Sequence, residues 1–571
     1  MRIALLNCYL QGHTENAETE STARFIEAAR RLGIEAGAFA RSEDLHEFKP
    51  DFVLALSYND AKLTEFPTYV LLTMPVEWIQ NLPRVLRNVL SFDGYWTVAP
   101  SVSEFVGALY TKAGKPDLGA FAAISYARTE FVPLDFRRAW AAYLGTNWDG
   151  NRHGEIFRAL APLGVAKFYG KRERWSHLPA DAWGGEVPFD GVSVLGAYRR
   201  AGIGLCMNHP DFDAEGIPTS RTFEVPAASA AIIAARNRLV EETFGDAALY
   251  VDTAGAPGSA ADQIREHVEW IRAHPKRASE MAEAGHRIFN ERFALEAFLA
   301  NALAMHRDAR PRLGFVPTGA ARPRAADQSA AAFAATVLIG VGDDSLRHFP
   351  RCLDSVLAQA LPPTRIVLMD GTVGATAADT LRAPGAAAIE HRRVPRGGPK
   401  LARLLARAEA DVASEWVCCI SAEEVLYPNH LFAVAEAARR HRRRHGAPPA
   451  ILYSGMAQIS EAAELPELMN DRYNVTRAEH MRLAQFDFAV SWKSITRLPL
   501  HPASCVWHVP ALRRASRPRW LTRLFPSALS RRLGSLAKGG GIAFTGAVTL
   551  ATSSSRAYTA FGQFTAPRGP P

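Results

Sequence analysis

Acidic and basic side chains occur in two stretches where they could perform chemistry. In the first, Ser220 and Arg221 precede Glu224 at the expected start of a helix of small residues, and Asn208 lies shortly before them. A helix start presents backbone N–H groups and a positive dipole end, which favour a diphosphate. Arg221 would add a charged hydrogen bond, and Glu224 would accept hydrogen bonds from ribose hydroxyls. The alternative is that Glu224 only satisfies the helix dipole.

The second stretch, VCCISAEEVLYPNHL, ends an apolar run in Glu423 and Glu424. Acids at the tip of a buried strand are suited to Mg²⁺ or Mn²⁺, because hard cations prefer oxygen ligands. A plain turn between a strand and a helix gives the same pattern.

Residues 1–135 contain short apolar runs separated by amphipathic helical stretches, which predicts a parallel sheet with helices on its faces. The segment NCYLQGHTEN follows the first expected strand, so the glycine fingerprint of dinucleotide-binding proteins is missing there. His13 in this segment and Glu77 further along are candidate general bases toward an acceptor hydroxyl. Each is also explained as a solvated loop residue.

Residues 136–310 repeat this pattern, so two Rossmann-like lobes are expected to face a cleft. Ligands of such sheets bind beyond the carboxyl ends of the strands. Gly145, Asn147 and Arg152 follow the first expected strand of this second lobe and are candidates for contacting such a ligand. A loop cap and a surface charge are the alternatives for Asn147 and Arg152.

The rest of the chain divides into a linker, a third unit and a tail. Residues 311–334 are rich in Pro, Ala and Arg, which indicates a linker, and a third α/β pattern covers 335–510. Residues 511–571 are basic and rich in Ser, Gly and Ala, which predicts an irregular tail. This tail could lie on an anionic membrane surface or be disordered.

Composition restricts the function classes. The 571 residues carry a net charge of +8, yet residues 488–571 hold 12 Lys and Arg and no acid. The remainder carries −4, which argues against nucleic-acid binding by the main body. No apolar run is long enough to span a bilayer, and the six cysteines form no CxxC pair. We therefore expect a cytoplasmic protein with buried thiols, in contact with the inner face of the membrane at most peripherally.

The second expected lobe resembles a known family. RTFEVPAASAAII, together with LGTNWDGNRHGEIFRAL and VPFDGVSVLGAYRRAGIGLCMNHP, is similar to group 1 glycosyltransferases of the GT-B fold, nearest the branch related to a spore-maturation protein. This resemblance implies a metal-independent site for a nucleotide-activated sugar, with Glu224 contacting the ribose and the Gly145–Asn147 turn facing the donor phosphates. Glu215 stands one residue further from Glu224 than the first acid of the family pattern does.

The third unit resembles a second family. FPRCLDSVLAQALPPTRIVLMDG and AEADVASEWVCCISAEEVLYPNHL are similar to family 2 glycosyltransferases of the GT-A fold, over residues 335–432. In the family, one of two acids before a glycine contacts the nucleotide base; here Met369 replaces the first, and the resemblance implies this contact for Asp370. Ser421 replaces the first acid of the family's metal motif. The resemblance therefore implies either a second transferase with Mg²⁺ or Mn²⁺ at Glu423 and Glu424, or a degenerate domain retained for binding.

We therefore expect a hexosyltransferase-type enzyme that moves a sugar from a nucleotide-diphosphate donor to a hydroxyl acceptor. A glycan or lipid-linked acceptor in cell-surface polysaccharide or glycoconjugate synthesis would fit. The alternatives are an inactive scaffold that binds nucleotide sugars and a nucleotide-sugar epimerase or dehydrogenase. The missing glycine fingerprint counts against the last of these.

Overall fold

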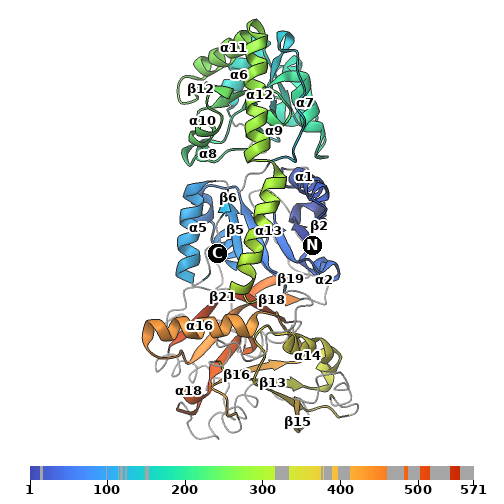
Figure 1. Cartoon of the computed structure of the whole chain (residues 1–571), viewed down its shortest axis with the longest axis vertical. Coiled ribbons are helices and arrows are strands. Elements are labelled where there is room, and N and C mark those ends of the chain that lie inside the picture. The colour runs from blue at the N-terminus through green and yellow to red at the C-terminus, as the bar shows by residue number, and fades with distance from the viewer. Residues whose placement is uncertain are drawn as a thin grey trace, which may run out of the picture.

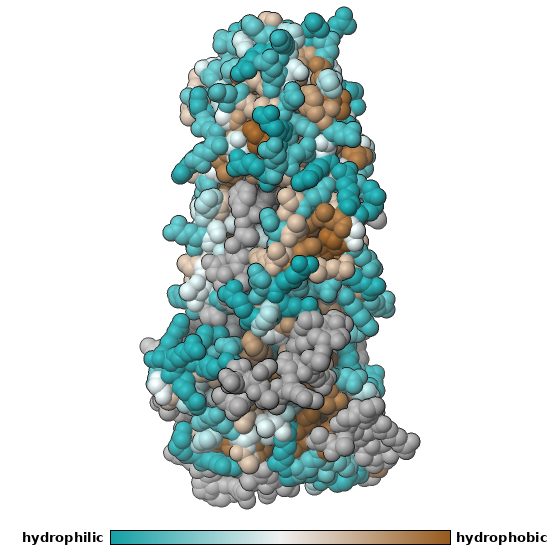
Figure 2. All heavy atoms as spheres, viewed as in Figure 1, coloured by the Kyte–Doolittle hydropathy of each residue, from teal (hydrophilic) through white to brown (hydrophobic). Residues whose placement is uncertain are grey.

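The computed structural model describes most of the chain. The described residues are 1–12, 17–97, 99–113, 115, 120–121, 125–147, 153–315, 333–373, 377, 389–395, 412–459, 481–485, 502–514 and 541–552. Three α/β units stack along the long axis, with the first lobe between the second lobe and the third domain (Figure 1). The visible face of the stack is largely hydrophilic, and hydrophobic atoms gather at the right side of the first lobe (Figure 2).

The first lobe has a six-stranded parallel sheet in the order β2-β1-β3-β4-β5-β6, which confirms the predicted architecture. Strands β1, β3, β4 and β5 are almost entirely buried and rich in Val, Leu and aromatic residues, as expected for a parallel sheet covered on both faces, whereas the edge strand β2 is partly exposed. The elements are β1 (Arg2–Leu6), α1 (Ala17–Arg31), β2 (Glu35–Phe39), α2 (Leu45–Phe48), β3 (Phe52–Ala55), β4 (Thr68–Leu72), α3 (Val76–Asn81), α4 (Pro83–Ser91), β5 (Gly94–Thr97), α5 (Pro100–Ala113) and β6 (Ala120–Phe121).

The second lobe has another six-stranded parallel sheet, in the order β12-β11-β10-β7-β8-β9. This is the doubly wound order of Rossmann folds. The elements are β7 (Trp140–Leu144), α6 (Gly154–Leu160), β8 (Ala166–Tyr169), β9 (Trp183–Gly185), α7 (Ser193–Ala201), β10 (Gly202–Cys206), α8 (Pro210–Ala214), α9 (Arg221–Ala227), β11 (Ala231–Ala235), α10 (Arg238–Phe244), β12 (Ala248–Val251), α11 (Pro257–Ala273) and α12 (Pro275–Arg292).

Helix α13 (Leu295–Arg312) follows α12 but packs on the first lobe. Phe298 and Leu299 lie in one apolar cluster with Phe25 of α1 and with residues of β3 and β4. The Phe298 ring stacks edge-on against Phe25, with 5.6 Å between ring centroids. The segment expected to close the second lobe therefore returns to cover the first, as the two long helices in Figure 1 show.

The third domain has a mixed sheet in the order β15-β14-β13-β16-β20-β18-β21-β17, with β19 paired to β18. Strands β13 to β16 run parallel, whereas β20 is antiparallel to both of its neighbours. The elements are β13 (Ala335–Val341), α14 (Phe349–Leu357), β14 (Arg365–Asp370), β15 (Ile389–Arg393), β16 (Trp416–Ser421), β17 (Glu424–Leu426), α16 (His430–His445), β18 (Ile451–Ile459), β19 (Met481–Gln485), β20 (Cys505–His508), α18 (Val509–Arg514) and β21 (Ile542–Thr552).

Strand β21 corrects the expectation of an irregular tail after residue 510. Its 11 residues lie between β18 and β17, and Val548, Leu550 and Ala551 are buried. The sequence did not predict this strand because glycines precede and interrupt it. Gly546 has φ +80°, and a Cβ atom there would lie 2.9 Å from the carbonyl oxygen of Ala113. The tail thus contributes to the core. All six cysteines are free and buried, as predicted.

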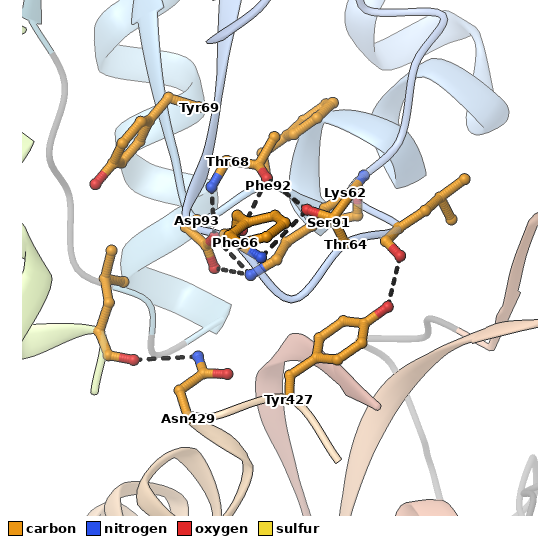
Figure 3. A network of polar contacts seen from close by, with 12 residues as sticks. Lys62, Thr64, Phe66, Thr68, Tyr69, Ser91, Phe92, Asp93, Tyr427 and Asn429 are labelled. Carbon is orange, nitrogen blue, oxygen red and sulfur yellow. Dashed lines mark hydrogen bonds and ion pairs between the residues drawn. The ribbon is translucent and has the colours of Figure 1, made fainter. Parts of the chain in front are cut away.

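Strand β21 also joins the third domain to the first lobe. Val548, Ala551 and Tyr427 belong to the same apolar cluster as Val89 and Val106 of the first lobe. At the edge of this apolar cluster, the Tyr427 hydroxyl donates to the carbonyl oxygen of Leu63 (Figure 3). The Asn429 side chain donates to the carbonyl oxygen of Leu313 over 3.1 Å, and the buried pair Lys62–Asp93 lies just above, with Nζ–O distances of 2.7 and 2.5 Å (Figure 3).

Candidate functional site

The second sheet has a switch point between β7 and β10. The chain passes from β7 outward to β8 and β9, and from β10 outward in the other direction to β11 and β12. Loops at such a point diverge and leave a crevice beyond the carboxyl ends of the strands. Gly145 follows β7 directly, and Asn208 lies two residues beyond the end of β10. The topology therefore brings these two predicted residues to one edge.

The turn after β7 is tightly built. A Cβ atom on Gly145 would lie 2.9 Å from Cε1 of Tyr143 and 3.3 Å from Nη2 of Arg221, so a larger residue would displace neighbours. Asn147 adopts φ +42°, a left-handed conformation that asparagine tolerates, and its side chain donates to the carbonyl oxygen of Arg174. Arg152, a predicted contact, lies outside the described residues.

Asn208 is buried with one side of its amide unused. Its Nδ2 donates to Asp213 Oδ1 over 2.6 Å, while no described group bonds its Oδ1. Burial raises the pKa of Asp213, against the hydrogen bonds from Asn208 and Asn237. A buried acceptor without a partner costs free energy. Asn208 therefore retains the capacity to accept a hydrogen bond.

Arg221 is held within its own lobe. Its guanidinium donates to the carbonyl oxygen of Leu144 (2.6 Å), the hydroxyl of Tyr143 (3.0 Å) and the hydroxyl of Thr219 (3.2 Å). It also lies over the Tyr143 ring, 4.5 Å from the centroid. These contacts tie α9 to the end of β7. A contact between Arg221 and a donor phosphate stays a prediction.

The start of α9 is less open than the sequence suggested. The N–H of Thr222 donates to the carbonyl oxygen of Thr219, and those of Phe223 and Glu224 donate to that of Ser220. The helix has only seven residues. It packs closely on the sheet because Gly204 of β10 has no side chain; a Cβ atom there would lie 2.0 Å from Val225 Cγ2. Ser220 is half-buried, and its side chain makes no cap hydrogen bond among the described residues.

Glu224 lies where the two lobes meet. It is only 6% exposed, and its Oε1 accepts a hydrogen bond from Nη2 of Arg24 over 2.8 Å. Arg24 belongs to α1 of the first lobe, 200 residues away in sequence. No described group donates to Oε2 of Glu224. Glu224, the residue predicted to contact the ribose, is thus bonded through one carboxylate oxygen to the opposite lobe.

Arg24 was missed by the sequence analysis, although α1 carried a signal. Glu20 and Arg24 stand four residues apart and share the buried face of α1 with Phe25 and Ala28. Charged residues on the apolar side of an amphipathic helix are rarely buried unless they are paired. That position could have indicated an ionic contact with another part of the fold.

A second set of polar contacts crosses between the lobes. Both carboxylate oxygens of Glu215 accept the N–H of Val76 at the start of α3, at 2.9 and 3.1 Å, and one also accepts the Ser101 hydroxyl. Glu215 therefore caps a helix of the first lobe. Glu77, a predicted base, is exposed and accepts a hydrogen bond from Asn81. His13 lies outside the described residues.

Asp370 lies at the carboxyl end of β14 in the third domain and is fully buried. It accepts hydrogen bonds from the N–H and hydroxyl of Thr372, from His391 Nε2 (3.0 Å) and from Arg393 (3.0 Å). Burial opposes ionisation, but these hydrogen bonds hold the pKa of Asp370 at about 2. Its oxygens are occupied by groups of its own sheet.

The paired glutamates of the third domain point to different surroundings. Glu424 is buried on β17, and its carboxylate accepts the N–H of Ser421. Glu423 is half-buried, and its N–H donates to the Ser421 hydroxyl. Within the described part of the chain, no three His, Cys, Asp or Glu side chains are grouped to hold a metal ion. A metal at Glu423 and Glu424 stays a prediction.

Part of the chain that forms the carboxyl edge of the second sheet is similar to a known protein family. Residues 152–304 match a family described as glycosyl transferase-like. The matched segment covers just over a quarter of the chain, from the loop after β7 through most of α13. No protein of curated function matches the sequence.

Several solved structures are similar in shape. Sucrose-phosphate synthase from Thermosynechococcus elongatus is 13% identical over 55% of this chain and 100% of its own, with a TM-score of 0.38. The Anabaena protein HepE, solved with UDP and glucose, is 10% identical over 53% and 99%, with a TM-score of 0.38. The pneumococcal O-GlcNAc transferase, solved with UDP and GlcNAc, is 9% identical over 47% and 59%, with a TM-score of 0.34. These likenesses are distant, and the strand orders establish the fold.

The length and polarity of the helices show whether any of them could span a membrane. Across the residues that the structure describes, no helix combines the length and apolar character needed to cross a bilayer. The basic segment expected to contact a membrane lies mostly outside those residues, apart from α18 and β21.

Proposed function

We propose that this chain is a glycosyltransferase that moves a sugar from a nucleotide-diphosphate donor to a hydroxyl acceptor. The donor would occupy the carboxyl edge of the second sheet, with its ribose at Glu224 and its diphosphate at the Gly145–Asn147 turn. This placement is supported by the match of residues 152–304 to a glycosyl transferase-like family and by the switch point between β7 and β10.

The observation that carries the proposal is the state of Glu224. Its carboxylate is almost fully buried at the junction of the lobes, yet one of its oxygens accepts no hydrogen bond from the described residues. A buried acceptor gains most from a donor that arrives with a ligand. The hydroxyls of a nucleotide ribose are such donors. Asn208 Oδ1, also unbonded by described residues, would supply a second acceptor at the same edge.

The chemistry would depend on positioning and on stabilising the leaving diphosphate. The hydroxyl acceptor would enter from the first lobe, and His13 and Glu77 remain the proposed bases for its proton. Because the N–H groups of Thr222, Phe223 and Glu224 already have partners, the phosphates would have to be met by the N–H protons of the Arg221 guanidinium that its own hydrogen bonds leave over. The module would need no metal.

The finer parts of the proposal concern pathway and place. We propose a hexosyl donor, a glycan or lipid-linked acceptor in cell-surface polysaccharide or glycoconjugate synthesis, and action in the cytoplasm, with the basic tail touching the inner face of the membrane. The third domain would be a GT-A-like unit. Asp370, Glu423 and Glu424 are its proposed nucleotide and metal contacts, with Mg²⁺ or Mn²⁺.

Nucleotide binding and turnover test the function. UDP-, GDP- and ADP-sugars are titrated against the wild type and Glu224→Gln, with and without Mn²⁺, by calorimetry and by donor hydrolysis. We expect one donor to bind and turn over without metal, and Glu224→Gln to weaken its binding by about 10- to 100-fold, the loss of a hydrogen bond to a charged group. Asp252→Asn, at an exposed loop residue of the same lobe, should bind like the wild type.

Three other outcomes would separate the rival functions. Tight binding without turnover would favour a nucleotide-sugar-binding scaffold. Binding that Glu224→Gln leaves unchanged would place the donor elsewhere. A Mn²⁺-dependent response removed by Glu423→Ala would assign activity to the third domain.

A further inference from the structure

An ionic cluster at the lobe junction has more hydrogen-bond acceptors than it uses. Arg24, whose side chain is 1% exposed, donates to Glu20 Oε1 through Nε (3.2 Å) and Nη2 (3.0 Å), and to Glu224 Oε1 through Nη2 (2.8 Å). Its guanidinium lies 3.9 Å from the centroid of the Tyr126 ring. One buried cation therefore faces two buried carboxylates.

The four carboxylate oxygens of this cluster are not equally satisfied. Glu20 Oε1 accepts from Arg24 and from the Tyr126 hydroxyl, and Glu20 Oε2 accepts the N–H of Gly191 over 2.8 Å. Glu224 Oε1 accepts from Arg24. Of these four oxygens, only Glu224 Oε2 receives no hydrogen bond from the described residues. A buried carboxylate oxygen without a donor is best matched by a group that donates hydrogen bonds, such as a hydroxyl.

Arg24 is itself rigidly placed. Glu20 binds it from the same helix, one turn earlier, and the Tyr126 ring covers its planar face. A buried arginine held in this way fixes the rotamer of a carboxylate that it contacts, because the planar guanidinium directs its N–H groups. The orientation of Glu224 is thereby set by a residue of the opposite lobe.

We propose that Arg24 is a positioning residue for donor recognition: it holds Glu224 so that Oε2 accepts hydrogen bonds from the vicinal hydroxyls of a nucleotide ribose. This inference rests on the proposed function. Since Arg24 belongs to the first lobe and Glu224 to the second, the ribose would be read only when the lobes are together. Binding of the donor and closure of the lobes would then be coupled through this ion pair.

The test compares nucleotides that differ only in the ribose. Affinities for UDP and 2′,3′-dideoxy-UDP, and for the GDP and ADP pairs, are measured by calorimetry on the full chain. The variants are Arg24→Met, Arg24→Lys and Glu224→Gln. The control is Arg30→Met, on the same helix, whose exposed side chain pairs with Glu27. The readout is the ratio of the two affinities, which a general loss of stability does not change.

The wild type and Arg30→Met should bind the ribonucleotide about 10- to 100-fold more tightly than the dideoxy form. In Arg24→Met and Glu224→Gln the ratio should fall to within about threefold of unity, and combining these two substitutions in one chain should lower it no further. Arg24→Lys should lie between, because an ammonium group cannot hold both carboxylates as the planar guanidinium does.

The contrary outcomes are distinct. If no nucleotide binds the wild type, the proposed function is overturned. If the wild type binds but does not discriminate, or if folded Arg24→Met keeps the full ratio, the assignment of Arg24 alone is overturned. Should Arg24→Met fail to fold, an unchanged ratio in Arg24→Lys overturns the assignment.

Discussion

The first lobe meets its two neighbours through junctions of different chemistry. Toward the second lobe, Ile217 and Phe212 pack on an apolar cluster of the first lobe, and polar contacts lie beside them. These are the ion pair of Arg24 with Glu224, the carboxylate of Glu215 on the N–H of Val76, and the indole N–H of Trp78 on Asp211. The polar groups among them can also bond to water or to a ligand.

Toward the third domain the contacts are mainly apolar. Val548, Ala551 and Tyr427 complete an apolar cluster of the first lobe, and a Cβ atom on Gly314 would lie 2.4 Å from the Phe432 ring. Separation here would expose buried apolar surface, which is unfavourable in proportion to its area. We infer that the first junction is built to open and close around a donor, and that the second is permanent.

The largest expected effect is at the permanent junction. Val548→Asp places a charge in a fully buried position and should destabilise the chain by at least about 4 kcal/mol, measured by urea unfolding. Val373→Asp, at a valine that is 46% exposed, should change stability by less than about 0.5 kcal/mol. If Val548→Asp unfolded the third domain alone and left the two lobes folded, the junction between the first lobe and the third domain would not be permanent.

A smaller effect is expected at the polar junction. Glu215→Ala removes the acceptor for the N–H of Val76 and the hydroxyl of Ser101, and should cost about 1 to 2 kcal/mol in the free energy of unfolding. Glu77→Ala, at the exposed neighbour of Val76, provides the control and should lie within about 0.5 kcal/mol of the wild type. A loss above about 4 kcal/mol for Glu215→Ala would show that this junction is as permanent as the other.

Lys115 predicts a pH dependence at the permanent junction, because Gly546 of β21 packs against its side chain. Burial lowers the pKa of Lys115 to about 7, well below that of an exposed lysine. Between that pH and about 10 the unfolded chain holds a proton that the folded chain has released, so stability rises with pH. From pH 7 to 9 the wild type should gain about 1 to 2 kcal/mol more than Lys115→Met. Parallel stability curves for the two proteins would contradict this.

The smallest effect concerns one hydrogen bond across the permanent junction. Tyr427→Phe leaves the carbonyl oxygen of Leu63 without its donor and should cost about 1 kcal/mol in chemical denaturation. Tyr95→Phe removes a comparable bond, to the carbonyl oxygen of Ser103, inside the first lobe. Similar losses would agree with a permanent junction. No loss for Tyr427→Phe alone would indicate that this junction opens.

Local patterns predicted the two parallel sheets, because each strand and helix carries its own apolar periodicity. They also led to Glu224, whose sequence context resembles a family motif. They could not reveal that Arg24 contacts Glu224, since 200 residues separate the two and no local period links them. For the same reason they assigned α13 to the lobe before it in sequence, whereas its apolar face packs on the first lobe.

The acids of the third domain show another limit of sequence. Asp370 lies at the end of β14, Glu423 just beyond the end of β16, and Glu424 at the start of β17, but sequence could not tell how many of their oxygens accept hydrogen bonds within the protein. His391 and Arg393 reach Asp370 from the neighbouring strand β15, and a backbone N–H reaches Glu424. Whether an acid is available to a ligand depends on such neighbours.

Strand β21 has a consequence for synthesis of the chain. The strands of the first lobe lie within residues 2–121, yet the core of that lobe includes Val548 and Ala551. Part of its apolar surface therefore stays uncovered until more than 400 further residues have been translated. During that interval the nascent chain would present a site for chaperones or for premature association, and completion of the first lobe waits for strand β21.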